Sequence, residues 1–241
     1  MRDYRRLSAA EIVVTLQVLR KRIDERFPGS GLSKVAAEVH DVACENVDRV
    51  RSIRRSSPFL RTVIFLLLAG TLGLGGYVGA SLLSGNIRWA PETGSDLIQE
   101  IESGLGIVVF VGAAVVYLWS VDARLKRVRA LTAIHELRSL AHIVDMHQLT
   151  KDPERVLGRG SRTASSPRMT MTPFLLGRYL DYCSELLALI ATVGALYAES
   201  FDDPLAVAAV DEIEDLTTGL SRKIWQKIMI LDRVAPDAGD G

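Results

Sequence analysis

Two stretches without a charged side chain constrain what this chain can fold into more than any other feature of its sequence. Residues 62–87 form one uncharged, mostly apolar run, and residues 103–121 form the other. A helix rises about 1.5 Å per residue, so roughly 20 residues cross a hydrocarbon core of about 30 Å. A chain of only 241 residues could hardly enclose two helices that are apolar on every side. The sequence therefore predicts two transmembrane helices, at about 62–85 and 103–121.

Basic side chains collect on the outer flanks of the two runs and are scarce between them. The flanking basic residues are Arg49, Arg51, Arg54, Arg55 and Arg61 before the first run, and Arg124, Lys126, Arg127 and Arg129 after the second. The segment between the runs is acidic. Short segments rich in Lys and Arg stay on the cytoplasmic side. We therefore expect a hairpin in a bacterial inner membrane, with both termini in the cytoplasm and a short acidic loop outside. The two basic collars would attract anionic lipids.

Small residues recur at a spacing of four in the first run. Gly75 and Gly79 form a GxxxG pair, and Ala69 and Gly73 repeat its spacing. Small residues four apart let two helix backbones approach closely in lipid. The pattern predicts either self-association of the chain or packing of the first span against the second. Neither span has an ionisable residue in its interior, which argues against a transporter. An oligomeric channel remains an alternative.

The amino-terminal residues, 1–57, are predicted to form a cytoplasmic helical hairpin. Ser8 followed by Glu11 is typical of a helix start. Apolar residues then recur every three or four positions, as expected for one buried face of a helix. They are Ile12, Leu16, Leu19, Ile23 and Phe27. The sequence FPGSG ends this helix, and a second helix leads towards the membrane.

Residues 122–234 are predicted to form a cytoplasmic helical bundle, which makes the whole chain all-α. Helical periodicity continues from the second span through Gln148. Residues 152–171 are rich in Gly, Ser, Pro and Arg and are expected to form a mobile basic loop. Residues 235–241 are expected to be a disordered tail.

Two further helices of this bundle have clear start signals. Thr172 and Pro173 give an N-cap followed by proline at the first helical position, and Asp203 and Pro204 repeat the pattern. The helix that begins near Pro173 contains the apolar run 186–198. Thirteen residues are too few to span a bilayer, so this run is interpreted as the centre of the bundle.

A stripe of chemically interesting side chains follows one side of the helix that ends near Gln148. At about 100° per residue, His135, Arg138, His142 and Asp145 share that side. The next helix has a similar stripe. If the two stripes faced each other, they could form an interhelical polar network of His135, Arg138, His142, Asp145, Arg178, Asp181 and Glu185. A narrower alternative is a divalent metal held by His142, Asp145, Asp181 and Glu185. A simple solvated helix face is the interpretation that the pattern favours over both of these, because a helix that buries its apolar face must show a polar face to water.

The remaining features exclude several functions and leave three hypotheses. The 29 basic and 29 acidic side chains balance, which argues against nucleic-acid binding. HExxH, GxSxG, CxxC and nucleotide-binding loops are absent from the sequence, so an enzyme is not favoured and no cofactor is predicted beyond that metal. The leading hypothesis is a membrane-anchored helical interaction or regulatory protein that forms homo-oligomers or binds a membrane protein. The alternatives are a metal-binding or catalytic bundle and a small oligomeric channel.

Overall fold

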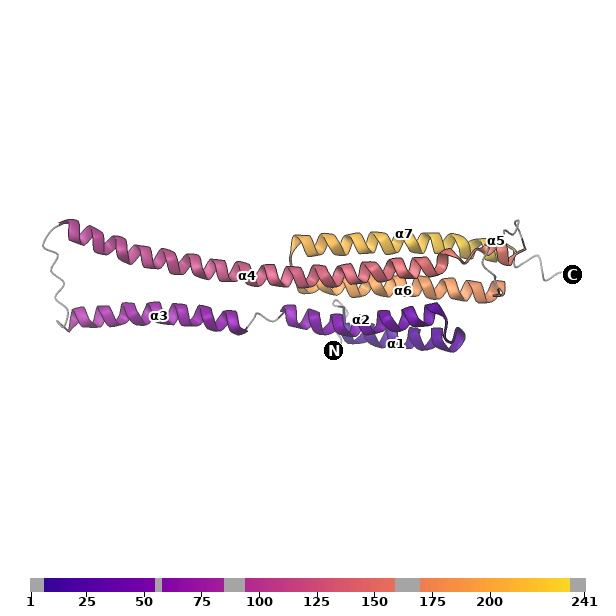
Figure 1. The fold of residues 1–241 in the computed structure, drawn as a ribbon, viewed down its shortest axis with the longest axis horizontal. Coiled ribbons are helices and arrows are strands. Elements are labelled where there is room, and N and C mark those ends of the chain that lie inside the picture. Colours follow the sequence, from indigo (N-terminus) through magenta and orange to yellow (C-terminus); the bar gives the residue numbers. More distant parts are fainter. Residues whose placement is uncertain (1–6, 55–57, 85–93, 159–169, 235–241) are drawn as a thin grey trace. The chain divides into compact units, whose positions relative to one another are not determined.

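The computed structural model describes residues 7–54, 58–84, 94–158 and 170–234. Within these residues all regular secondary structure is helical (Figure 1), which confirms the all-α class. The helices are α1 (Ala9–Arg26), α2 (Gly31–Arg54), α3 (Pro58–Leu83), α4 (Gly94–Leu149), α5 (Pro153–Val156), α6 (Pro173–Ser200) and α7 (Pro204–Val234). Four predicted features lie partly or wholly outside the described residues. They are the first part of the external loop between the predicted spans, residues 159–169 of the basic loop predicted at 152–171, the tail at 235–241 and Arg55.

Polar side chains cap the helices at the predicted starts. Ser8 accepts a hydrogen bond from the backbone N–H of Glu11 at the start of α1. Thr172 likewise accepts a backbone hydrogen bond at the start of α6. At the start of α7, Asp203 accepts hydrogen bonds from two backbone N–H groups. The first N–H groups of a helix have no acceptor within the helix, so these side chains satisfy them. The start signals in the sequence therefore correspond to real caps.

Helix α4 runs without a break from Gly94 to Leu149. It includes residues 103–121 and continues beyond them, as the periodicity predicts. It also begins earlier than expected, inside the segment that was predicted to be the external loop. The first turns of α4 are acidic in sequence, and negative charge stabilises the amino-terminal end of a helix. The residues that suggested an acidic loop thus also favour a helix start.

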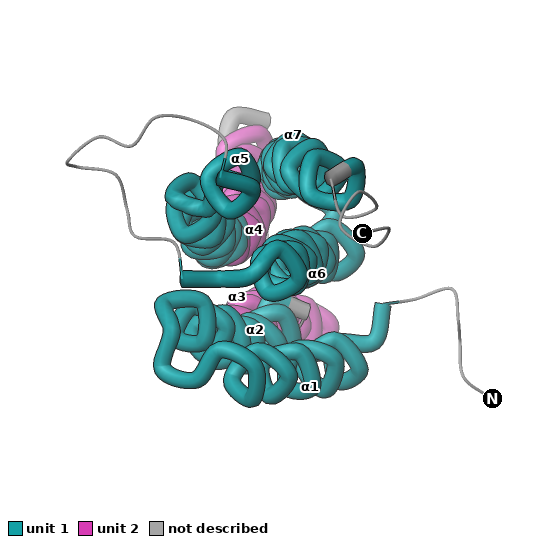
Figure 2. Tube along the Cα trace, turned by 90° about the vertical axis from the view of Figure 1, so that its right-hand side faces the viewer, with its two compact units in different colours: residues 1–54, 127–241 teal, residues 55–126 magenta. Residues whose placement is uncertain are grey.

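Residues 1–54 and 127–241 form one compact unit, shown in teal in Figure 2. Helix α6 packs against α1, α2 and α7. Leu137 of α4 and Ile213 of α7 lie next to Gly194 of α6, so α4 joins the same core. The five apolar positions predicted for the buried face of the first helix are all buried. Residues 1–57 and 122–234 are predicted to be separate regions, whereas their described buried side chains share a single core.

Residues 55–126 form the second unit, shown in magenta in Figure 2, which contains α3 and the first part of α4. Three helical segments of the structure are long and apolar enough to cross a membrane: Gly31–Ser81, Glu102–Val156 and Pro173–Ser200. Two such segments are predicted from the sequence. The third segment is α6, whose full length exceeds the 13-residue run considered there. Its most apolar window is 56% buried inside the protein, against 0% for the windows of the other two segments.

Candidate functional site

The four predicted metal ligands, His142, Asp145, Asp181 and Glu185, do not form one group. His142 is exposed on α4. Asp145 accepts a hydrogen bond from the amide of Gln148 at 2.6 Å. Throughout the residues that the structure describes, no three His, Cys, Asp or Glu side chains lie close enough together to hold a metal ion.

The two acidic members of this set on α6 both form ion pairs with arginines. Asp181 contacts Arg178 of the same helix at 2.8 Å. Glu185 contacts Arg22 of α1 at 3.1 Å. The polar stripe of α6 is therefore directed at α1 on one side of the unit.

The polar stripe of α4 has a different partner. Arg138 forms an ion pair with Glu212 of α7 at 2.9 Å, and His135 is exposed. Helices α4 and α6 approach each other through apolar surface, where Leu137 lies next to Gly194. Because the apolar faces pack together, the stripes on the two helices point away from that contact. Among the described residues, the ion pairs of the network are therefore made with α1, with α7 and within α6, rather than between α4 and α6.

The last turns of α4 make contacts that sequence reasoning missed. The ring of His147 lies against Gly31 at the start of α2, where an added Cβ atom would clash with the ring. Lys227 of α7 donates to the backbone carbonyl of Gln148 at 2.8 Å and to its side-chain oxygen at 2.6 Å. The lysine thus caps the negative end of the α4 dipole.

Neither Cys183 nor its neighbourhood is arranged for nucleophilic chemistry. The side chain is fully buried, and this burial raises the pKa of the Cys183 thiol to about 12. A thiol with that pKa is protonated at neutral pH, and only the thiolate is a strong nucleophile.

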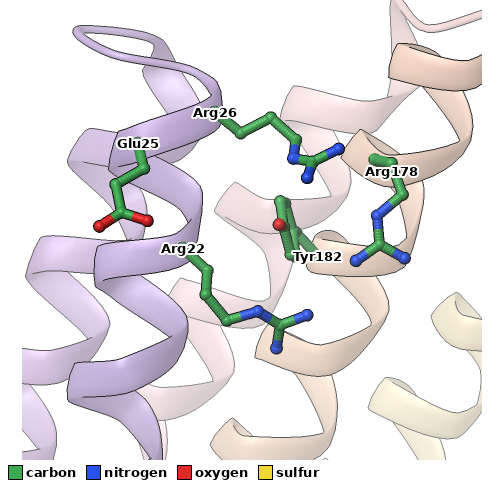
Figure 3. A pocket seen from close by; sticks show the side chains of 5 residues that line it. All are labelled: Arg22, Glu25, Arg26, Arg178 and Tyr182. Carbon is green, nitrogen blue, oxygen red and sulfur yellow. The ribbon is translucent and has the colours of Figure 1, made fainter.

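A cavity at the α1–α6 contact, here called the arginine pocket, has three arginine side chains in its lining. It has a volume of about 420 Å³ and is lined by Arg22, Glu25, Arg26, Arg178 and Tyr182. Figure 3 shows the three guanidinium groups extending towards the side of Tyr182, while the carboxylate of Glu25 points away from that ring. The pocket combines three residues near the end of α1 with two near the start of α6.

Two of these arginines are held firmly in place. The guanidinium of Arg22 lies 5.3 Å from the centre of the Tyr182 ring, and that of Arg178 lies 5.2 Å from it. Such cation–π contacts orient the planar groups. A hydrogen bond with Tyr182 also raises the pKa of Arg178, which keeps it charged. Arg22 and Arg26 are four apart in the sequence, a spacing that places both on one side of α1, but their proximity to Arg178 depends on packing.

A buried polar contact lies elsewhere in the same unit. The hydroxyl of Tyr197 on α6 donates to the Oδ1 atom of Asn46 on α2. Both residues are completely buried. The amide nitrogen of Asn46 has no hydrogen-bond partner within the described structure. This pair links α2 to α6 through a single satisfied bond in an apolar core.

Several residues of the predicted basic collars are already paired with acids. Arg49 contacts Glu136 of α4 at 2.5 Å and Glu45 at 3.1 Å. The other described pairs are Arg51–Asp48 at 3.3 Å, Lys126–Asp122 at 2.7 Å and Arg127–Asp203 at 2.7 Å. Arg61, Arg124 and Arg129 are exposed.

The predicted small-residue positions of α3 fall on different sides of the helix. An apolar groove of about 650 Å³ between α3 and α4 is lined in part by Thr71, Gly75 and, from α4, Gly104. Ala69 and Gly73 do not line it and are exposed, while Gly79 is half-buried and also lies outside it. At about 100° per residue, Ala69 and Gly73 lie about 160° from Thr71. Of the four predicted small residues, Gly75 thus lines the groove, while Ala69, Gly73 and Gly79 lie outside it.

Comparisons with known proteins identify no relative: no family model, no curated protein and no solved structure matches this chain.

Proposed function

We propose that this chain is a membrane-anchored helical interaction protein of the bacterial inner membrane, and that it self-associates through its anchor. The observation that carries the proposal is the difference in burial between the two units. Large apolar side chains of α3 are exposed, including Leu72 at 76% and Phe65 at 69%. Exposed apolar surface on this scale is unfavourable in water and natural in lipid. Helix α6, the third apolar segment, is assigned to the bundle because other helices cover it.

The ends of the two proposed spans have side chains suited to a membrane interface. Arg61 near the start of α3 lines a cavity of about 250 Å³ together with Trp119 and Asp122 of α4. Trp119 is 74% exposed. Tryptophan and arginine favour the boundary between hydrocarbon and water. The basic flanks support cytoplasmic placement of both termini, and therefore of the helical bundle.

The second small pair of α3 supports self-association. Ala69 and Gly73 do not line the groove that α3 forms with α4, and within the described residues both are exposed. A second copy of α3 could approach this face closely. Exposed Met146 on α4 and Trp225 and Met229 on α7 offer apolar contact area for partners of the bundle.

Oxidative cross-linking in native membranes tests the proposal. We would replace Cys44 by serine, keep the buried Cys183, and compare Ala69→Cys with Thr71→Cys. The two positions lie in the same span but on opposite sides of α3. We expect a disulfide-linked dimer for Ala69→Cys and mostly monomer for Thr71→Cys.

Two results would count against this proposal. Monomers alone for both variants would exclude self-association through α3. Recovery of the chain in the soluble fraction without detergent would exclude the membrane anchor itself.

A further inference from the structure

The arginine pocket has a composition that membrane anchoring does not explain. We propose that it binds the phosphate group of a small phosphorylated ligand, and that Arg22, Arg26 and Arg178 hold that group. Arginine presents a planar fork of N–H donors that matches phosphate oxygens in pairs. Three such forks on one cavity suit an anion with at least three acceptor oxygens, which favours phosphate over carboxylate.

Two of the three arginines are already positioned for a ligand. The ion pairs with Glu185 and Asp181 each use the Nη1 atom of Arg22 and Arg178, respectively. A guanidinium group has five N–H donors, so donors remain after these contacts are made. Because the ion pairs and the Tyr182 ring fix both side chains, binding does not have to order them, and that reduces its entropic cost.

The third arginine provides the charge that is not neutralised. Arg26 lies 5.8 Å from the ring of Phe174 and contacts no carboxylate in the described part of the chain. Glu25 is directed away from Tyr182 (Figure 3) and lies 3.9 Å from Lys21. The pocket lining therefore has three positive charges and one negative charge, and the negative charge of Glu25 is paired with Lys21.

The size and position of the pocket favour a soluble ligand. A volume of about 420 Å³ is in the range of small-molecule sites. Tyr182 lies on α6 18 residues before Ser200, which is roughly 27 Å along the helix. Ser200 precedes Asp203, the partner of Arg127, and Arg127 belongs to the basic collar. The pocket is thus at the opposite end of α6 from the ion pair of Arg127 with Asp203.

Binding of inorganic phosphate to the full-length protein in phosphatidylcholine nanodiscs tests the proposal. Calorimetric titrations would be made at constant ionic strength set with chloride. We expect saturable binding that Arg26→Gln weakens about tenfold, while Arg26→Lys retains part of it because it keeps the charge but loses the fork. Arg20→Gln is the matched control, since Arg20 is on the same helix, pairs with Asp41 at 3.8 Å and lies outside the pocket.

Nanodiscs that contain phosphatidic acid distinguish a soluble phosphate from a lipid head group, with phosphatidylglycerol as the control for surface charge. Competition by phosphatidic acid alone would assign the site to a lipid phosphate monoester, and unchanged binding would assign it to a soluble one. Either result supports a phosphate site. Absence of saturable binding, or equal weakening by Arg20→Gln and Arg26→Gln, would overturn it.

Discussion

Helices α3 and α6 are similar in length, with 26 and 28 residues, but their apolar side chains have opposite surroundings. In α6, Leu180, Leu187 and Ile190 are completely buried against neighbouring helices. In α3, Leu72 and Phe65 are largely exposed. Both helices are apolar enough to cross a bilayer, so apolar character alone does not decide where such a helix belongs.

What separates the two helices is the distribution of their polar residues. Helix α6 has charged side chains on one side, and Arg178, Asp181 and Glu185 all make ion pairs there. Helix α3 has no charged residue after Arg61. A polar stripe gives a helix a side that needs water or ionic partners, whereas an uncharged helix can be surrounded entirely by lipid. The comparison can be tested by making matched changes in the two helices.

The largest difference is expected from truncating one leucine in each helix. Leu187→Ala removes a fully buried side chain of α6 and should lower the free energy of unfolding by about 2–5 kcal/mol. Leu72→Ala in α3 should cost less than about 0.5 kcal/mol, because Leu72 is 76% exposed to its surroundings. Denaturant titration in detergent, followed by circular dichroism, measures both. If both variants lost the same free energy of unfolding, Leu72 would have to pack against protein. The contrast between α3 and α6 would then disappear.

A smaller loss in the free energy of unfolding is expected from removing one tyrosine hydroxyl group in each unit. Tyr197→Phe leaves Asn46 buried without its one hydrogen-bond partner, so it should cost about 1–3 kcal/mol. Tyr77→Phe in α3 is the matched control, and its 69% exposure predicts almost no change. The same denaturant titration measures both variants.

A double variant tests the cause of this loss. Adding Asn46→Leu to Tyr197→Phe removes the unsatisfied amide and should restore part of the stability. If Tyr197→Phe alone had no effect, the buried pair would not stabilise the contact between α2 and α6.

The sequence was sufficient to predict the local features of the fold. Ser8, Thr172 and Asp203 cap helices as predicted, because a cap depends only on residues three positions apart. The buried face of α1 follows from the spacing of residues such as Leu16 and Ile23, which is also a local property. The carboxyl-terminal end of α4 is also predictable, because the helical periodicity that marks it is a local property.

Contacts between distant segments were not predictable in this way. Two polar stripes were recognised, but which helix each one meets depends on how the apolar faces pack. Arg22 of α1 meets Glu185, and Arg138 meets Glu212, although the residues of each pair are far apart in the sequence. The arginine pocket arises from the same packing of α1 on α6. No periodicity within one helix contains that information, so the candidate site became visible only in three dimensions.

The smallest change in the free energy of unfolding is expected from substituting Asp203, which pairs with Arg127 where α4 enters the bundle. Burial acts to raise the pKa of Asp203, but its hydrogen bond with Arg127 and those from the N–H groups of Ala206 and Leu205 outweigh burial and lower the pKa below its ordinary value of 3.8. A carboxylate whose pKa is lowered by folding stabilises the folded state above the unfolded pKa. This contribution disappears as the pH falls through the folded pKa.

Asp203→Asn separates the charge from the cap, because asparagine is also a good N-cap. We expect a loss of about 1 kcal/mol at neutral pH, measured as the free energy of unfolding, and a difference from the unsubstituted protein that shrinks as the pH falls below about 4. Asp202→Asn is the control, since Asp202 is the exposed neighbouring carboxylate. A difference between Asp203→Asn and the unsubstituted protein that stays constant from neutral to acidic pH would mean that Asp203 acts only through its cap. The ion pair with Arg127 would then not tie α4 to the start of α7, and α4 would be held in the bundle by its apolar face alone.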